Sequence, residues 1–82
     1  MISHDSIETA YSFFHQKHRV FIHSTLDWQK DNIEMAIAQY ADGMDAELFA
    51  LLAQNRPDFL HNHALFASEL EEALNRLEEM LG

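Results

Sequence analysis

The last third of the chain carries the clearest pattern of apolar and polar positions. Apolar residues recur there every three or four positions, which is the spacing of one face of an α-helix. The spacing predicts a helix over residues 57–81 that packs lengthwise against a neighbouring helix, with its glutamates, including Glu69, facing water. The predicted inner stripe consists of Phe59, His63, Phe66, Leu70, Ala73, Leu74, Leu77, Met80 and Leu81, so His63 is expected to be a core histidine.

Three further helices are predicted upstream, over residues 6–23, 26–41 and 45–54. Asp5 and Glu8 form a capping-box pattern at the start of the first, and Ser24 and Asp45 are the expected caps of the second and third. Gly43 is expected to end the second helix, because glycine readily takes the positive φ of a C-terminal cap. Helix breakers at residues 55–57 separate the third helix from the fourth.

These patterns predict an all-α fold, a small bundle of about four helices in a single domain over residues 1–82. A chain of this length leaves much apolar surface hard to cover, and this one has no cysteine to form a disulfide. The segment 6–23 is apolar over more than half of its helical circumference. We therefore expect a homodimer, in which a second copy covers the excess apolar surface.

An apolar pair stands on the polar side of the second predicted helix. Trp28 and Met35 are seven positions apart and share a face with acidic neighbours such as Asp31, and an apolar centre with a polar rim is typical of a protein contact surface. Phe13 and Val20 occupy one flank of the first predicted helix. These five residues are the candidate partner-binding surface. The alternative is that the second helix packs on two sides, which would place Trp28 and Met35 in the core.

Six histidines raise the question of a metal site. His15 and His18 are three apart in the first predicted helix and are the candidate ligands, but no third ligand follows on their face. The chain also lacks the His-Glu-x-x-His and Glu-x-x-His patterns, so no metal and no cofactor is predicted. Lys17 and His18 fall within the apolar arc, where His18 is expected to meet an acidic residue of a neighbouring helix or protomer.

The formal net charge of −9 opposes direct binding to nucleic acid, whose phosphates supply much of the affinity. No apolar run reaches the roughly 18 residues of a membrane span, and residues 1–8 lack the order of a signal peptide, so a cytoplasmic location away from membranes is expected. Basic and histidine residues gather in the first 23 positions and glutamates in the last 15. The first and last helices are therefore expected to lie side by side.

No nucleophile, phosphate loop or paired-carboxylate pocket is evident, so we expect a protein that is not an enzyme. The leading hypothesis is a self-associating interaction or regulatory module. A second is an acidic inhibitor or nucleic-acid mimic, which would bind a basic protein through the Glu-rich end and through Asp27, Asp31, Glu34 and Asp42. A third is a small metal-binding bundle that uses His15, His18 and a carboxylate.

Overall fold

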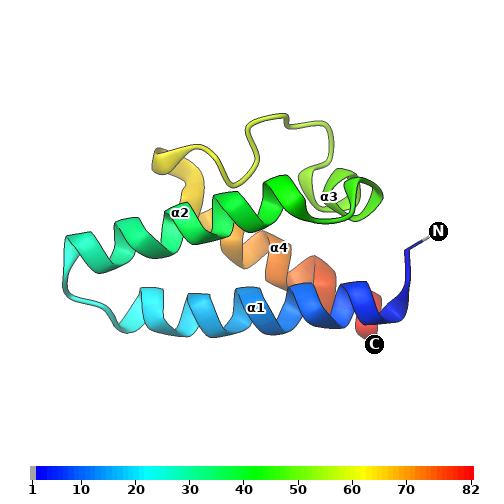
Figure 1. Cartoon of the computed structure of the whole chain (residues 1–82), viewed down its shortest axis with the longest axis horizontal. Helices are drawn as coiled ribbons and strands as arrows, with labels where there is room; N and C mark the ends of the chain where they lie inside the picture. The colour runs from blue at the N-terminus through cyan, green and yellow to red at the C-terminus, as the bar shows by residue number, and fades with distance from the viewer. Residues whose placement is uncertain (1) are drawn as a thin grey trace.

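The computed structural model describes residues 2–82, and within that range it contains helices and no β-strand. The elements are α1 (His4–His23), α2 (Asp27–Gly43), α3 (Ala46–Ala53), the 3-10 helix η1 (His63–Leu65) and α4 (Phe66–Leu81) (Figure 1). The predicted all-α bundle is therefore confirmed. Among residues 2–82, none of the helices combines the length and the apolar character needed to cross a lipid bilayer.

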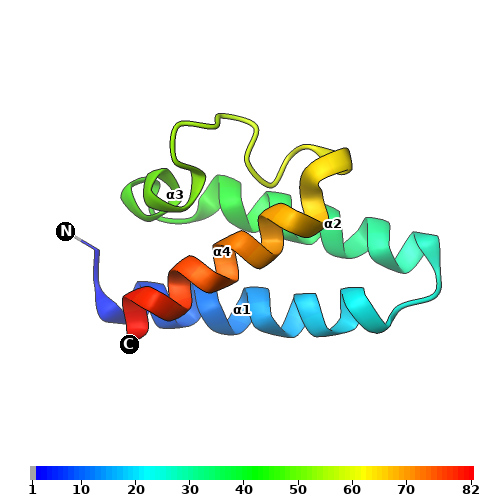
Figure 2. The ribbon, with the colours of Figure 1, turned by 180° about the vertical axis from the view of Figure 1, so that it is seen from behind.

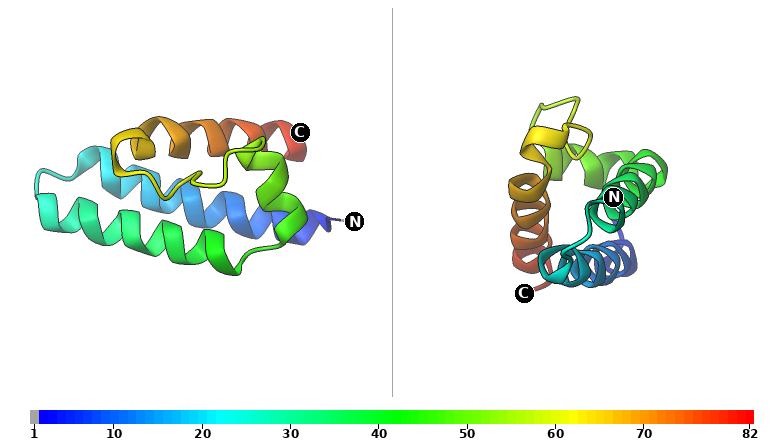
Figure 3. Two further views of the ribbon diagram at one scale, coloured as in Figure 1. Left: turned by 90° about the horizontal axis from the view of Figure 1, so that it is seen from above. Right: turned by 90° about the vertical axis from the view of Figure 1, so that its left-hand side faces the viewer.

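Three helices form the body of the molecule. α1 and α2 make an antiparallel hairpin, and α4 runs across one side of it in contact with α1 (Figure 2). Seen end-on, α1, α2 and α4 outline a triangle, while α3 and the segment after it lie at its top (Figure 3). The expectation that the first and last helices lie side by side is thus met within a single protomer.

The core fills the space between these helices. It is made of Ala10, Phe14, Ile33, Ile37, Ala41, Leu48, Leu52, Ala53, Phe59, Leu60, Phe66, Leu70, Ala73, Leu74 and Leu77. Phe21, at the far end of α1, is partly buried and packs edge-on against Phe66, with 5.4 Å between the ring centroids. Fully burying one large apolar side chain stabilises the fold by about 1.5–3 kcal/mol. The predicted stripe of α4 supplies much of this core, from Phe66 to Leu77.

The helix starts follow local side-chain chemistry. The hydroxyl of Ser3 accepts a hydrogen bond from the Ser6 N–H, so α1 begins at His4 and the predicted Asp5 capping box is not its cap. The carboxylate of Asp45 accepts from the N–H groups of Glu47 and Leu48 at 2.9 and 3.1 Å, as predicted for the start of α3. A cap needs only neighbouring residues, which explains why α3 is located well from the sequence.

Gly43 ends α2 as predicted, but it is not a left-handed glycine cap, and the predicted Ser24 cap of α2 is wrong. Gly43 is the last residue of α2, has no positive φ, and is followed by Met44 in an extended conformation with φ −79° and ψ 171°. The turn needs no left-handed residue because the Asp45 cap starts α3 immediately afterwards. Ser24 lies in the turn, where its hydroxyl donates to Gln29 Oε1 at 2.8 Å, and Leu26 occupies the N-cap position of α2.

The largest difference from the prediction is the start of the last helix. Residues 54–62 form an irregular connection, and α4 begins at Phe66 rather than at Pro57. Gln54, Asn55 and Leu60 have positive φ of 49°, 70° and 65°, which excludes a continuous right-handed helix. The segment still contributes to the core, since the side chains of its residues Phe59 and Leu60 are fully buried.

Glu69 explains how this irregular segment is held. It was expected to face water, yet it is only 2 % exposed. Its Oε1 accepts a hydrogen bond from the N–H of Leu60 at 2.9 Å, and Arg56 Nη1 lies 3.7 Å from its Oε2. The loop therefore brings a donor and a cation to the carboxylate, and both offset the cost of burying it.

Arg76 ties α3 to α4. Its guanidinium donates to the carbonyl of Leu52, near the end of α3, and to the side chain of Gln54 at 2.8 Å. It also forms an i,i+4 ion pair with Glu72, which in turn accepts a hydrogen bond from Arg56. The two arginines thus fix the end of α3 and the start of the loop to one face of α4.

Candidate functional site

The α1–α2 turn concentrates exposed apolar side chains. The large hydrophobic residues that are exposed are Val20, Ile22, Leu26, Trp28, Met35, Leu51 and Leu65. Four of the seven lie between Val20 and Trp28, where α1 turns into α2. We call residues 16–31 the hairpin end. It projects beyond the start of α4, at the end of the molecule opposite the first and last residues that the structure describes (Figures 1 and 3).

The outer face of α2 carries Trp28 and Met35. These side chains are 62 % and 59 % exposed, so α2 does not bury them against a second neighbour within the chain. Asp31, also exposed, lies between them on the same helix. The predicted apolar pair with an acidic neighbour is therefore present on the surface. Its role in binding a partner stays a prediction.

Val20 and Phe13 lie in different surroundings. Val20 is exposed beside an open cleft of about 560 Å³ lined by Gln16, Lys17, Arg19, Val20, His23, Ser24 and Gln29. Phe13 is half-buried and stacks on Tyr40 of α2, with 4.4 Å between ring centroids. Lys17 extends over the Phe13 ring at 5.5 Å. Val20 thus joins the hairpin end, whereas Phe13 mainly holds α1 against α2.

The charges of the hairpin end are divided between its two helices. Three of the five lysines and arginines lie there, Lys17 and Arg19 on α1 and Lys30 on α2, while Arg56 and Arg76 are engaged with glutamates of α4. α2 contributes Asp27 and Asp31 to the same end. The first helix of the hairpin is therefore basic and the second largely acidic.

Among residues 2–82, the structure brings no third ligand to His15 and His18. His15 stacks on Tyr11 at 5.6 Å between ring centroids. His18 Nε2 lies 3.9 Å from Glu71 Oε1, which is the acidic partner on a neighbouring helix that the sequence predicted. In the described part of the chain, the group of three acidic or histidine side chains close enough to share a metal contains neither of these histidines.

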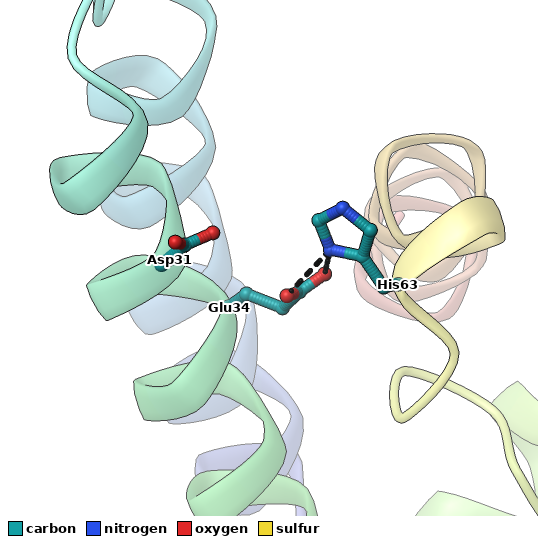
Figure 4. Close-up of side chains that lie close together, drawn as sticks. All are labelled: Asp31, Glu34 and His63. Carbon is teal, nitrogen blue, oxygen red and sulfur yellow. Dashed lines mark hydrogen bonds and ion pairs between the residues drawn. The ribbon is translucent and has the colours of Figure 1, made fainter.

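That group consists of Asp31, Glu34 and His63, and sequence analysis missed it (Figure 4). Asp31 and Glu34 are one helical turn apart on α2, and His63 opens η1 on the facing side (Figure 4). His63 Nδ1 donates to the two carboxylate oxygens of Glu34 at 3.0 and 2.9 Å. One potential ligand atom from each residue lies within 4.8 Å of the others.

The group lies in a cleft between α2 and the start of α4. The cleft has a volume of about 500 Å³ and is lined by Phe21, Asp27, Lys30, Asp31, Glu34, His63, Ala64, Phe66 and Ala67. Asn62 positions His63, because its side chain accepts from the Ala64 N–H at 3.0 Å and so starts η1. The hydrogen bond and negative charge of Glu34, with a smaller contribution from Asp31, raise the pKa of His63. This imidazole therefore sits in an anionic setting.

A last helix that begins at Pro57 places His63 on the core-facing stripe, and this prediction is wrong. In the structure the side chain of His63 is 82 % exposed, since the helical register begins only after it. The i,i+3 spacing of Asp31 and Glu34 was the one signal present in the sequence. His63 comes close to Asp31 and Glu34 because of the path of residues 54–62, and no local sequence pattern predicts that path.

Comparison with protein-family models, with curated proteins and with solved structures finds no match to this chain. Its function is therefore inferred from the residues of the hairpin end and of the neighbouring cleft.

Proposed function

We propose that this chain is a non-enzymatic interaction module that self-associates through its hairpin end. The observation that carries the proposal is the set of four large apolar side chains exposed between Val20 and Trp28, extended along α2 by Met35. Contiguous exposed apolar surface with a polar rim marks sites of protein association. We also propose a cytoplasmic location, as expected from the sequence.

The charges of the hairpin end favour a second copy as the partner. In a twofold arrangement, α1 of one protomer faces α2 of the other, so each contact forms twice. Arg19 would then lie near Asp27 of the partner. Within residues 2–82 neither Arg19 nor Asp27 forms an ion pair, so both charges are available for such a contact.

The acidic-inhibitor alternative has less support. Two of the four carboxylates proposed for it already accept hydrogen bonds from histidines of the same chain, Glu34 from His63 and Asp42 from His61. Lys30 also lines the same cleft as the remaining two, Asp27 and Asp31. A surface of mixed sign is a poor mimic of a uniformly charged nucleic acid.

Sedimentation equilibrium over a wide concentration range tests self-association. We expect a reversible dimer in the wild-type protein. Replacing Val20 and Trp28 together by serine is expected to weaken dimerisation at least about tenfold, because apolar anchors supply most of the association free energy. Leu51→Ser is the control, since the exposure of Leu51 lies between those of Val20 and Trp28 but the residue is on α3, away from the hairpin end. A monomeric wild-type protein, or equal weakening by Leu51→Ser, would refute the proposal.

A charge exchange tests the twofold pairing. Arg19→Asp is expected to weaken the dimer by placing like charges opposite each other, and adding Asp27→Arg to the same chain should restore it. Circular dichroism confirms that each variant retains its helices. Failure of the double variant to recover affinity would contradict the pairing of α1 with α2 of the partner.

A further inference from the structure

We propose that Asp31, Glu34 and His63 form a binding site for a divalent transition-metal ion, with Zn²⁺ as the best-fitting ion. The three side chains come from two elements, α2 and η1. Glu34 and His63, which are in contact, are 29 residues apart in the sequence. The site is thus built by the tertiary fold and goes beyond the interaction function proposed above.

The donor set matches this class of ion. One imidazole nitrogen and two carboxylates are ligands that Zn²⁺ accepts at about 2.0–2.2 Å, and three protein ligands leave a fourth position for water or another group. Mg²⁺ and Ca²⁺ prefer oxygen ligands throughout and a higher coordination number, so they gain nothing from the imidazole. The nitrogen donor therefore selects for transition metals.

The spacing requires only a small adjustment. Ligand atoms around a tetrahedral Zn²⁺ lie about 3.4 Å apart, given bonds of about 2.1 Å. The three candidate ligand atoms lie within 4.8 Å of one another, so their separations would have to shrink by up to about 1.4 Å to complete the set. Asp31 and His63 are exposed and Glu34 is half-buried, which leaves their side chains room to rotate without disturbing the core.

The charges in the cleft also favour a cation. Two carboxylates face one imidazole, and Asp31 forms no ion pair with any residue of the described chain. Lys30 lines the same cleft but its Nζ lies over the Phe21 ring, 5.7 Å from the centroid. A metal ion would replace the Nδ1 proton that now bridges His63 and Glu34, and that proton would pass to solvent.

The consequence for the fold is a link between α2 and the start of α4. The His63–Glu34 contact joins η1 to α2 at this point, and its histidine side is exposed. A bound ion holding three side chains would fix η1 more firmly, and a ligand that binds only the folded state raises its stability. The thermal midpoint of unfolding should therefore rise on adding Zn²⁺.

Isothermal titration of ZnCl₂ into chelator-treated protein tests the site. We expect one Zn²⁺ per chain, and binding weakened at least about tenfold by His63→Gln and by Asp31→Asn, since each removes a ligand. Glu34→Gln provides a third variant that keeps an oxygen acceptor for His63. His15→Gln and His18→Gln are the matched controls, because these histidines lie on α1 outside the cleft. Mg²⁺ at the same concentration should give no binding.

Thermal unfolding supplies the second measurement. Zn²⁺ should raise the midpoint of the wild-type protein and of His15→Gln but not that of His63→Gln. Absence of Zn²⁺ binding to the wild-type protein would overturn the proposal. Unchanged affinity and stoichiometry in His63→Gln would also overturn it, as would a loss in His15→Gln or His18→Gln as large as the loss in His63→Gln.

Discussion

A single buried carboxylate organises the least regular part of this molecule. Glu69 accepts the N–H of Leu60, a residue in the left-handed conformation, and faces Arg56 from inside the fold. No donor among residues 2–82 forms a hydrogen bond with its Oε2, so the nearby Arg56 guanidinium is the main compensation for that oxygen. One side chain of α4 thereby determines the path of the preceding segment.

Substitution of Glu69 tests this role. Glu69→Ala is expected to lower the free energy of unfolding by about 1–3 kcal/mol, because the buried N–H of Leu60 loses its acceptor. Glu69→Gln keeps an oxygen acceptor and should lose less. Urea unfolding measures both, and Glu79→Ala, an exposed position on the same helix, should change the value by less than about 0.5 kcal/mol. Equal losses for Gln and Ala would show that the hydrogen bond is not the cause.

The position of Glu69 shows which residues of a helix a hydrophobic pattern can correctly predict as buried. It borders the buried arc of α4, next to Leu70 in sequence and one turn from Phe66 and Ala73. The pattern gives the centre of the arc correctly. Whether a residue at its border faces water depends on which segment packs beside it, and that is a tertiary property.

At the scale of elements, the connection between α3 and α4 behaves as part of the core. Phe59 is fully buried and contacts Phe49 of α3 edge-on, with ring centroids 6.2 Å apart, and Arg56 lies 4.9 Å from the Phe59 ring centroid. His61 Nδ1 donates to the carbonyl of Phe59 and its Nε2 to Asp42, at 2.8 and 2.9 Å. The segment is thus attached to α2, α3 and α4 although it is not helical.

A pair of leucines tests that conclusion. Leu60→Ala is expected to cost about 2–5 kcal/mol of stability, the range for emptying a buried leucine site. Leu65→Ala changes a residue that is about half exposed, and its cost should be well under half of that. Chemical denaturation of the two variants provides the comparison. Similar losses would indicate that residues 54–62 do not pack as described.

The same elements show why some boundaries follow from sequence and others do not. The end of α1 and the start of α3 are set by residues beside them, such as the Asp45 cap. The late start of α4 depends on positive φ at Gln54, Asn55 and Leu60. Asparagine enters that region fairly often, but glutamine and leucine rarely do, so the sequence does not give the path of the whole segment. The mistaken start then misplaced His63. As a result the Asp31–Glu34–His63 group was missed, whereas the exposed Trp28–Met35 pair needed only an i,i+7 pattern on one helix.

For the whole molecule, the ionisable groups predict a stability maximum in mildly acidic solution. The hydrogen bond from Arg56 and the charges of Arg56 and Arg76 lower the pKa of Glu72, so its contribution is present above its ordinary value of 4.5 and is lost as the pH falls through the lower, folded value. The Phe59 carbonyl and Asp42 raise the pKa of His61. Its contribution is complete below its ordinary value of 6.5 and is lost as the pH rises through the folded value.

Urea unfolding at about pH 3.5, 5.5 and 8, with a chelator present and at low protein concentration, should therefore show the greatest stability at the middle value. His61→Gln should flatten the decline toward pH 8, and Glu72→Gln the decline toward pH 3.5. The net charge of −9 also lowers the stability at pH 8 relative to pH 5.5, because protonating histidines reduces charge repulsion within the folded chain. Greater stability at pH 8 than at pH 5.5 would contradict this account.

The packing of α4 on α1 also determines how the chain must fold. These are the first and last helices, so their contact closes a loop that contains α2 and α3. The chain loses the conformational entropy of closing that loop before the contact contributes any favourable free energy. The α1–α2 hairpin is local and can form early, but it shares its buried core with Phe66, Leu70, Ala73, Leu74 and Leu77 of α4, so that core is incomplete until α4 packs against the hairpin. Docking of α4 is therefore the step that turns a loose pair of helices into a cooperative domain.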